Sequence, residues 1–562
     1  MESQLSTQHA ILLGEERNEN RPSVGVIQTG GYSFIRFVAD EKEFQRFFEQ
    51  MDAVKIHISD LNKSYEAGEL TEPEYRDSLE HRWLNVVVRA FVMKYGVNSV
   101  PIDVRNSVND VAEYLNSDIL NDIIDEGWTN VRLVSVPVDR PDFIIGEFFI
   151  DVAFGGARLR SDDPYYFLAQ QLGGILAMEG FLVRTGGGPG IMDAFPVGYK
   201  QELKRSQASN IDRQTQGIRI VLPFEQAISP SVDTLTMMKT FAVRRTALIW
   251  NARGIAVFPG GLGTLNELFE AWRGAINRKV DCPIVVLPSR FYAPFLEAIK
   301  KVIVIGRGLI LTSDFGLVQK AESPMEAKRL LMQPLREKEM GEQLTLREKL
   351  IYLRHELARG LTAISELPPA VVFIGSRYFL NRTDPEVLFL RDLVKAIVAT
   401  SKLGVRVGVC GLVDEVIHES VNEVRDRKAT TNIIQRVLIS EDIDSGYEGK
   451  RVDACFKSLV AHREILTHNA IAAFFLPSDL PSLDILFALV CEIQTRRRER
   501  IPVFLVGLEF WQPIMDGLRE TMRGDYDGQF IKYDDLDIMT VIGTTPRDLE
   551  NAMAEIQSSQ HR

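Results

Sequence analysis

The sequence predicts an α/β fold with two tandem doubly wound, Rossmann-like parallel-sheet domains, the second degenerate, behind an N-terminal α+β domain. Apolar runs that end in glycine turns and lead into helical segments recur along the chain, as in parallel sheets. The whole series of runs and turns occurs twice, in the same order. The length of 562 residues also exceeds what a single hydrophobic core usually supports.

These patterns divide the chain into four parts. Residues 1–145 form an N-terminal domain of unknown role, and residues 146–321 form the first α/β domain. Residues 322–366 are rich in Glu, Lys, Arg and Leu, which predicts a linker of one or two helices. Residues 367–562 form the second α/β domain, for which we expect a structural or regulatory role.

The expected strands are the apolar runs. In the first α/β domain they are Phe148–Phe154, Gly180–Val183, Ile218–Leu222, Ile255–Phe258 and Cys282–Leu287. In the second they are Ala370–Ile374, Val405–Val409, Ala472–Leu476 and Ile501–Val506. Helical segments follow these runs, which predicts helices on both faces of each sheet.

An internal duplication accounts for the repeated pattern. Pro259 recurs as Pro477, and Val183-Arg184 recurs as Val405-Arg406. The alternative is two doubly wound domains that share strand-turn-helix order without common ancestry. Five positions of the second copy differ from the first in charge or backbone: Gly260-Gly261 becomes Ser478-Asp479, Gly263 becomes Pro481, Glu267 becomes Ile485 and Arg244 becomes His462. An aspartate and a proline in an anion-binding turn add repulsion and remove an N–H donor.

Charge and composition exclude several classes of partner. The formal net charge of −12 argues against a protein that coats nucleic acid or an anionic membrane. Four scattered cysteines form no Cys-x-x-Cys pair, so we expect neither a disulfide framework nor a metal site. The polar N-terminus lacks a signal-like apolar core, and no apolar run is long enough for a membrane span, which favours a cytoplasmic protein.

The segment Pro-Gly-Gly-Leu-Gly-Thr-Leu-Asn-Glu, residues 259–267, lies where an apolar run gives way to a helical pattern. The first N–H groups of a helix lack partners within the helix and carry partial positive charge, so a phosphate fits such a turn. The alternative is local: Thr264 and Glu267 have the spacing of a capping box.

A second glycine loop, Gly186-Gly187-Gly188-Pro189-Gly190, follows an earlier strand. Loops at the carboxyl ends of neighbouring parallel strands converge, so both glycine loops are expected to face one ligand. Arg244-Arg245 supplies a local basic cluster beside them, and the arginine fork suits phosphate. Taken separately, the glycines also suit close packing and the arginines a solvated helix face.

With Gly-Gly-Gly-Pro-Gly-Ile-Met-Asp at 186–193 and the motif at 259–267, the first α/β domain resembles the LOG ("lonely guy") phosphoribohydrolases, often labelled lysine decarboxylases. The segment Leu222-Pro223-Phe224-Glu225-Gln226 and the Arg244-Arg245 pair have matching places. The chain departs from plant members at Arg245 and Asn266, and it lacks a serine after Gly155-Gly156. In these departures and in its length, it is more similar to large bacterial nucleotide nucleosidases.

The resemblance implies hydrolysis of the N-glycosidic bond of nucleoside 5′-monophosphates to free base and ribose 5-phosphate. Arg244 and Glu267 are the implied catalytic residues. The implied substrate and phosphate contacts are Gly186, Gly187, Gly188, Met192, Glu225, Arg245, Gly260, Gly261, Gly263 and Thr264. No metal or cofactor is implied, and the only lysine near the motifs, Lys239, lacks the surroundings of a pyridoxal-phosphate site.

Two other functions stay open at this point. One is a nucleotide-binding sensor that holds its ligand without cleaving it, and the other is transfer of the ribosyl group to an acceptor other than water. The resemblance also implies a homo-oligomer, with the tandem copy standing in for one subunit of a dimer. A nucleotide regulator is a further expected partner.

Overall fold

The computed structural model describes two α/β domains and three short N-terminal strands. The described residues are 24–29, 32–37, 100–101, 150–179, 181–206, 215–220, 229–238, 240–333, 346–376, 381–408, 411–427, 432–439, 452–523, 530–531 and 535–560. The strands β1 (Val24–Thr29), β2 (Tyr32–Phe37) and β3 (Val100–Pro101) form an antiparallel sheet. The rest of the predicted N-terminal α+β domain lies outside the described residues.

The first α/β domain contains a parallel sheet of seven strands in the order β10-β9-β8-β4-β5-β6-β7. The strands are β4 (Ile150–Phe154), β5 (Leu182–Thr185), β6 (Gln216–Ile220), β7 (Thr234–Met238), β8 (Ala252–Val257), β9 (Ile284–Val286) and β10 (Val318–Lys320). The five expected strands are present, and β7 and β10 were not predicted.

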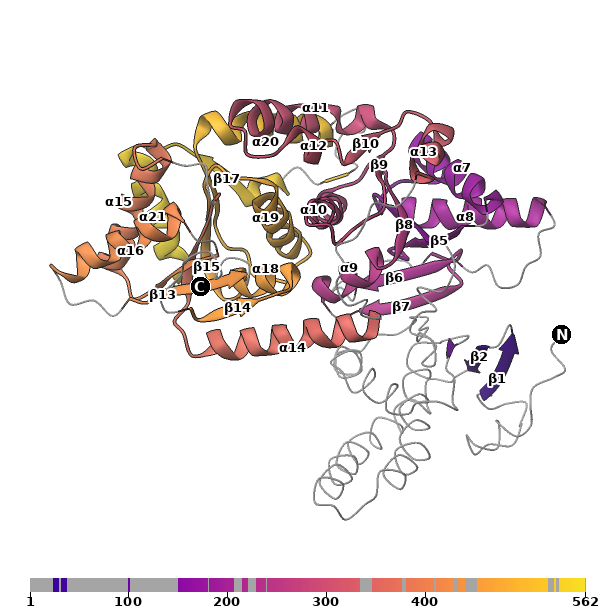
Figure 1. The fold of residues 1–562 in the computed structure, drawn as a ribbon, viewed down its shortest axis with the longest axis horizontal. Coiled ribbons are helices and arrows are strands. Elements are labelled where there is room, and N and C mark those ends of the chain that lie inside the picture. The colour runs from indigo at the N-terminus through magenta and orange to yellow at the C-terminus, as the bar shows by residue number, and fades with distance from the viewer. Residues whose placement is uncertain are drawn as a thin grey trace, which may run out of the picture.

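Helices cover both faces of this sheet (Figure 1). They are α7 (Pro164–Met178), α8 (Ile191–Arg205), α9 (Phe241–Ile249), α10 (Leu262–Ile276), α11 (Ser289–Ile299), the π-helix η3 (Lys300–Gly306), α12 (Thr312–Phe315) and α13 (Pro324–Leu331). Helix α13 contacts α7, β8 and β9, so it packs on the first domain. Helix α14 (Leu346–Ser365) follows and contacts α9 and α18 (Leu459–Thr467).

The second α/β domain repeats this topology. Its seven strands lie in the order β14-β13-β12-β11-β15-β16-β17. Read from the other edge, that order matches the first sheet strand for strand, as a duplication predicts. The strands are β11 (Ala370–Ile374), β12 (Gly404–Val407), β13 (Ile434–Ile439), β14 (Ala454–Phe456), β15 (Ala470–Phe475), β16 (Val503–Val506) and β17 (Met539–Ile542). Besides α18, the helices are α15 (Pro385–Thr400), α16 (Leu412–Arg425), α19 (Leu480–Gln494), α20 (Leu508–Arg523), the 3-10 helix η4 (Leu536–Ile538) and α21 (Pro546–Gln560).

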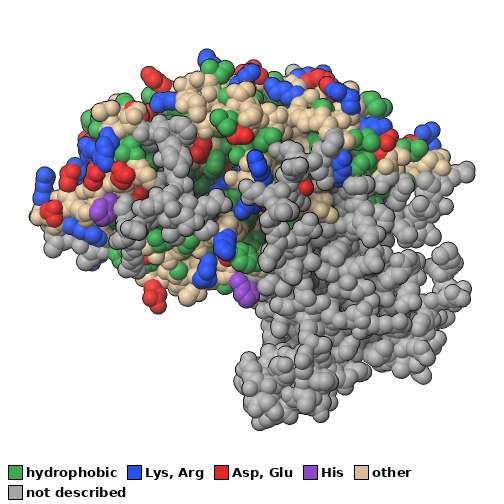
Figure 2. Space-filling model, in the orientation of Figure 1, with side chains coloured by type: hydrophobic (Ala, Val, Ile, Leu, Met, Phe, Trp, Pro, Cys, Tyr) green, Lys and Arg blue, Asp and Glu red, His purple; other side chains and the backbone are tan. Residues whose placement is uncertain are grey.

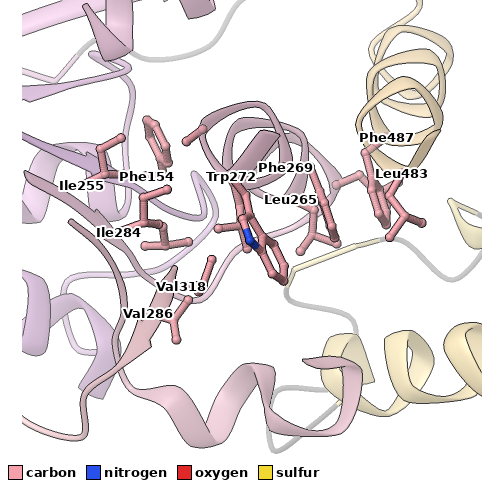
Figure 3. Close-up of a cluster of buried hydrophobic side chains, with 14 of the residues drawn as sticks. Phe154, Ile255, Leu265, Phe269, Trp272, Ile284, Val286, Val318, Leu483 and Phe487 are labelled. Atoms are coloured by element: carbon pink, nitrogen blue, oxygen red, sulfur yellow. The ribbon is translucent and has the colours of Figure 1, made fainter. Parts of the chain in front are cut away.

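The two α/β domains pack through equivalent helices. Helix α10 contacts α19, α11 contacts α20, and α9 contacts α18. At the centre, Phe269 and Phe487, which occupy equivalent positions of the two copies, stack with ring centroids 4.9 Å apart, and Leu265 and Leu483 lie beside them (Figure 3). Contact between the same surface of two copies is the geometry of a two-fold dimer. The chain therefore contains both halves of a dimer-like interface.

The surface carries charges of both signs. Figure 2 shows Lys, Arg, Asp and Glu side chains interspersed over the described part of the face in view. None of the helices in the described ranges is long and apolar enough to cross a membrane.

Candidate active site

Three loops meet at the carboxyl edge of the first sheet. The loop after β4 is joined to the 259–261 turn because the Gly156 N–H donates to the Pro259 carbonyl oxygen at 2.9 Å. It is joined to the loop after β5 because the Ile191 N–H donates to the Gly156 carbonyl at 3.1 Å. The prediction that the two glycine loops converge is therefore confirmed.

The structure explains some glycines of these loops by close packing and leaves one without such an explanation. Gly190 has a φ of 70°, and a side chain there would overlap the Gly156 carbonyl. A side chain at Gly260 would overlap the Thr264 hydroxyl. Gly263 is different, because its nearest neighbour on that side is Cys491 Sγ, at an ordinary contact distance of 3.9 Å. Close packing thus accounts for Gly190 and Gly260, and leaves Gly263 unconstrained.

The capping-box alternative for Thr264 and Glu267 is wrong. Helix α10 begins at Leu262 and its N-cap residue is Gly261, which offers no side-chain cap. Thr264 and Glu267 therefore lie inside the helix, and the Thr264 hydroxyl packs against Gly260. The first-turn N–H groups of α10 receive no side-chain cap, and they lie where the loops meet, so the helix dipole favours an anion there.

Arg244 and Glu267 form an ion pair beside the loops. Helix α9 is capped by the Thr240 hydroxyl, which accepts from the Val243 N–H, and Arg244 lies in its first turn. Arg244 Nη1 donates to Glu267 Oε1, while its Nε donates to the Ile218 carbonyl of β6 at 3.1 Å. The two side chains are 9% and 10% exposed, so the pair is shielded from most of the solvent.

The second glycine loop lies against this ion pair. A side chain at Gly186 would overlap the Arg244 guanidinium and approach Met192 Sδ to 2.6 Å. A side chain at Gly188 would come within 2.7 Å of Met192 Cε. The structure therefore brings together Gly186, Gly188, Met192, Arg244 and Glu267 as one cluster.

Burial governs the electrostatics of Glu267. Burial raises the pKa of Glu267, and the positive charges of Arg244 and Arg245 oppose that shift.

Tyr292 of α11 lies nearby and donates its hydroxyl to the Phe258 carbonyl at 2.8 Å. Burial, and then the charge of Glu267, raise the pKa of Tyr292, so its hydroxyl stays protonated. Tyr292 was not predicted, because it belongs to no motif.

The side chain of Arg245 points away from the Arg244–Glu267 ion pair and toward the second domain. Its guanidinium donates to Asn266 Oδ1 at 2.6 Å, to Glu270 and to Glu464 Oε1 of the second domain at 3.1 Å. The side chain is 1% exposed. The structure thus places Arg245 among the carboxylates of the domain interface, whereas the motif had suggested a contact with the substrate.

Glu225, a predicted substrate contact, lies outside the described residues, as does Lys239. Gly187 has a φ of 69°, and its N–H donates to the Thr185 hydroxyl at 3.1 Å. Asp193, next to Met192, accepts from the Tyr166 hydroxyl at 2.8 Å and from the Ser229 hydroxyl, so it holds α8 in place at this edge.

Known proteins resemble parts of this chain. Residues 202–331 match the family described as "Possible lysine decarboxylase". The pyrimidine/purine nucleotide 5′-monophosphate nucleosidase of Escherichia coli (strain K12) is 28% identical over 123 residues, which are 21% of this chain and 25% of that relative. The chain thus matches about a quarter of that relative's length. The resemblance to the LOG family predicted from the motifs is confirmed.

Solved structures give weaker matches. The molybdenum cofactor binding protein from Rippkaea orientalis is 21% identical, with a TM-score of 0.24, and the match covers 33% of this chain and 94% of that one. The molybdenum cofactor carrier protein from Chlamydomonas reinhardtii is 23% identical, with a TM-score of 0.23, over 33% of this chain and 99% of that one.

Proposed function

We propose that the first α/β domain hydrolyses the N-glycosidic bond of nucleoside 5′-monophosphates. The observation that carries the proposal is the buried Arg244–Glu267 ion pair at the point where the glycine loops meet the uncapped start of α10. The match of residues 202–331 to the "Possible lysine decarboxylase" family and the partial match of the chain to a nucleotide nucleosidase support the same class of reaction.

The charges suit the chemistry of this bond. Breaking the bond leaves positive charge on the ribose, and a carboxylate about 4 Å away stabilises that charge by about 4 kcal/mol at an effective dielectric constant near 20. This free energy corresponds to roughly a thousandfold in rate. Glu267 is the carboxylate in place, and Arg244 orients it through their ion pair. Glu267 is also the group available to accept a proton from the attacking water.

The phosphate is expected at the start of α10. The N–H groups of residues 262–264 receive no side-chain cap and lie next to Gly260 and Gly261. Contacts to a phosphate there are remote from the bond that breaks, so they hold the ribose in register while Glu267 acts. Assembly into homo-oligomers, which the resemblance implies, and a nucleotide regulator both stay predictions.

The test is product chromatography with AMP, GMP, IMP, CMP and UMP, using the parent protein and its Glu267→Gln variant. We expect free base and ribose 5-phosphate from the parent, and a loss of about a thousandfold in kcat in the variant. Glu297→Gln is the matched control, because Glu297 is a 56% exposed glutamate of α11 in the same domain.

Three outcomes contradict the proposal in different ways. Binding of a nucleotide without cleavage by the parent favours the sensor. Ribosyl transfer to an added alcohol in preference to water favours a transferase. Equal loss of activity in Glu267→Gln and Glu297→Gln removes the special role of Glu267.

A further inference from the structure

Two residues of the second α/β domain lie on the glycine turn of the first. Phe530 and Ile531 come between α20 and η4. A side chain at Gly261 would overlap the carbonyl oxygen of Phe530 and come within 3.4 Å of Ile531 Cγ2. A side chain at Gly156 would lie 3.5 Å from Phe530 Cδ1. The backbone of the second domain therefore approaches the turn as closely as a glycine permits.

The ring of Phe530 is buried in the first domain. It packs edge-on against Phe291 of α11, with centroids 4.7 Å apart, and lies 6.3 Å from the ring of Tyr165 at the start of α7. Phe530 is 6% exposed. Aromatic pairs at such distances contribute about 0.5–1.5 kcal/mol beyond the area they bury. The ring thus anchors the backbone of residue 530 over the turn.

A second residue of the same domain lies near the first turn of α10. Cys491 of α19 lies 3.9 Å from the position of a side chain at Gly263 and forms an apolar cluster with Ile220 and Phe241. Gly263 and Glu267 lie one helical turn apart on α10 and so share a face of that helix. The second domain therefore lies near the start of α10 at two places, with Phe530 at Gly261 and Cys491 near Gly263.

We propose that Phe530 is a positioning residue for the glycine turn at 259–261, so that the second domain holds the anion-binding backbone of the first. This inference rests on the proposed function, since it concerns the turn that would bind the 5′-phosphate. Glycines leave a turn conformationally free, and Gly261 offers no side-chain cap of its own. A misplacement of about 1 Å in a positioning element can lower an enzyme's rate by about a hundredfold. Because this turn would hold the phosphate, we expect the loss of its anchor to weaken phosphate binding.

The test compares Phe530→Ala and Phe530→Leu with the parent protein. Nucleotide hydrolysis gives KM and kcat, calorimetry gives the Kd for ribose 5-phosphate, and thermal unfolding checks the fold. We expect Phe530→Ala to raise KM and Kd together by about 10- to 100-fold, with kcat changed by less than about 3-fold, since Phe530 acts on the turn and leaves the Arg244–Glu267 pair in place. Phe530→Leu keeps most of the volume, so its expected rise is about 3- to 10-fold. This variant carries the test if Phe530→Ala does not fold.

Phe487→Leu is the control. Phe487 stacks on Phe269 across the same domain interface, away from the 259–261 turn, so its replacement loosens the interface without removing the anchor. Unchanged KM and Kd in the Phe530 variants overturn the inference, and so does an equal rise in Phe487→Leu. A parent protein that binds ribose 5-phosphate but cleaves no nucleotide contradicts the hydrolysis, while the Kd series still decides the role of Phe530.

Discussion

The buried arginine of the second strand is the same in both α/β domains. Arg184 of β5 donates from Nε to Gln216 at 3.0 Å and from Nη1 to the Leu248 carbonyl at 3.2 Å. Arg406 of β12 donates to Gln435 at 2.9 Å and to the Leu466 carbonyl at 3.2 Å. Both arginines are fully buried. The duplication has thus kept the hydrogen bonds that join the second and third strands to the helix before the fifth.

The carboxyl edges of the two sheets differ. His462 stands in the place of Arg244, and its Nε2 lies 3.0 Å from the Val437 carbonyl, the equivalent of the Ile218 carbonyl that Arg244 reaches. Burial lowers the pKa of His462 to about 4, so it is neutral at pH 7. The second copy therefore keeps the bond to the strand and has lost the cation. The comparison separates residues that build the scaffold from residues that we propose to act in catalysis.

The largest expected effect comes from breaking a feature that both copies share, the buried arginine of α9 and α18. Arg463 is the equivalent of Arg245 and donates to Asp484 at 2.6 Å and to Glu270 at 3.0 Å. Arg463→Leu leaves buried carboxylates with less compensation, so we expect the free energy of unfolding to fall by about 3–5 kcal/mol. Urea denaturation measures it.

The matched control for that prediction is Arg382→Leu. Arg382 also pairs with two carboxylates, Glu415 and Glu419, but is 48% exposed, so its expected effect is below about 1 kcal/mol. A loss below about 1 kcal/mol in Arg463→Leu, as expected for Arg382→Leu, would contradict a stabilising role of the buried interface network.

The next prediction introduces into the first domain the residue that the second domain has at the equivalent position. Arg244→His retains a donor toward β6 and removes the charge beside Glu267. We expect kcat to fall by about a hundred- to a thousandfold, the range for losing one preorganised electrostatic group, with the thermal midpoint little changed. Steady-state kinetics checks this. The reciprocal His462→Arg adds a cation but no carboxylate, because Ile485 stands where Glu267 would be, and it should create no second activity.

A smaller effect concerns stability and pH. Asp151 lies on central strand β4, where the second copy has Val371, and within the described residues neither carboxylate oxygen has a hydrogen-bond partner. Burial raises its pKa well above 3.8, and Arg253 opposes the shift. The folded protein therefore binds this proton more tightly than the unfolded chain does. The contribution of this proton binding to the free energy of unfolding is fully present below pH 3.8. It is lost as the pH rises through the folded-state pKa of Asp151.

Asp151→Val should therefore stabilise the protein by about 1–3 kcal/mol at pH 8, with a gain that shrinks toward pH 4. Denaturant titrations at several pH values measure the difference. Asp151→Asn is the control, since it cannot ionise but stays polar. A gain in Asp151→Val that is the same at every pH would contradict ionisation as the cause.

The smallest effect tests the centre of the dimer-like interface. A double-mutant cycle with Phe269→Leu and Phe487→Leu should give a coupling free energy of about 0.5–1.5 kcal/mol, because the two rings stack on each other. Strictly additive losses in unfolding experiments would mean that the stacked pair adds nothing beyond buried area.

Local patterns predicted much of the fold. Each expected strand in the two sheets is a run of apolar residues that ends in a turn, and such runs are readable because both faces of a parallel strand are buried. The missed strands lie at or near the edges, and the sequence Thr234–Met238 of β7 contains polar residues that blur the pattern. The convergence of the two glycine loops followed from the general rule for parallel sheets.

The site was predicted in part, because some contacts come from the other domain. Arg244 and Glu267 were identified by motif, and the ion pair brings them together. Arg245 has the same side chain as Arg244 but points to a different part of the structure. One helical step of about 100° turns it toward Glu464. Phe530 belongs to no motif and lies in the other half of the chain from Gly261, so no local signal identified it.

The pairing of α10 with α19 inside one polypeptide changes how this interface can evolve. In a homodimer every substitution appears on both sides of the two-fold axis, so a site cannot be lost on one side only. Fusion removes that restriction, and the second half is free to lose a charge at His462 while Phe530 serves the first half. Tethering also gives the halves an effective concentration on the order of millimolar, so dilution does not separate them.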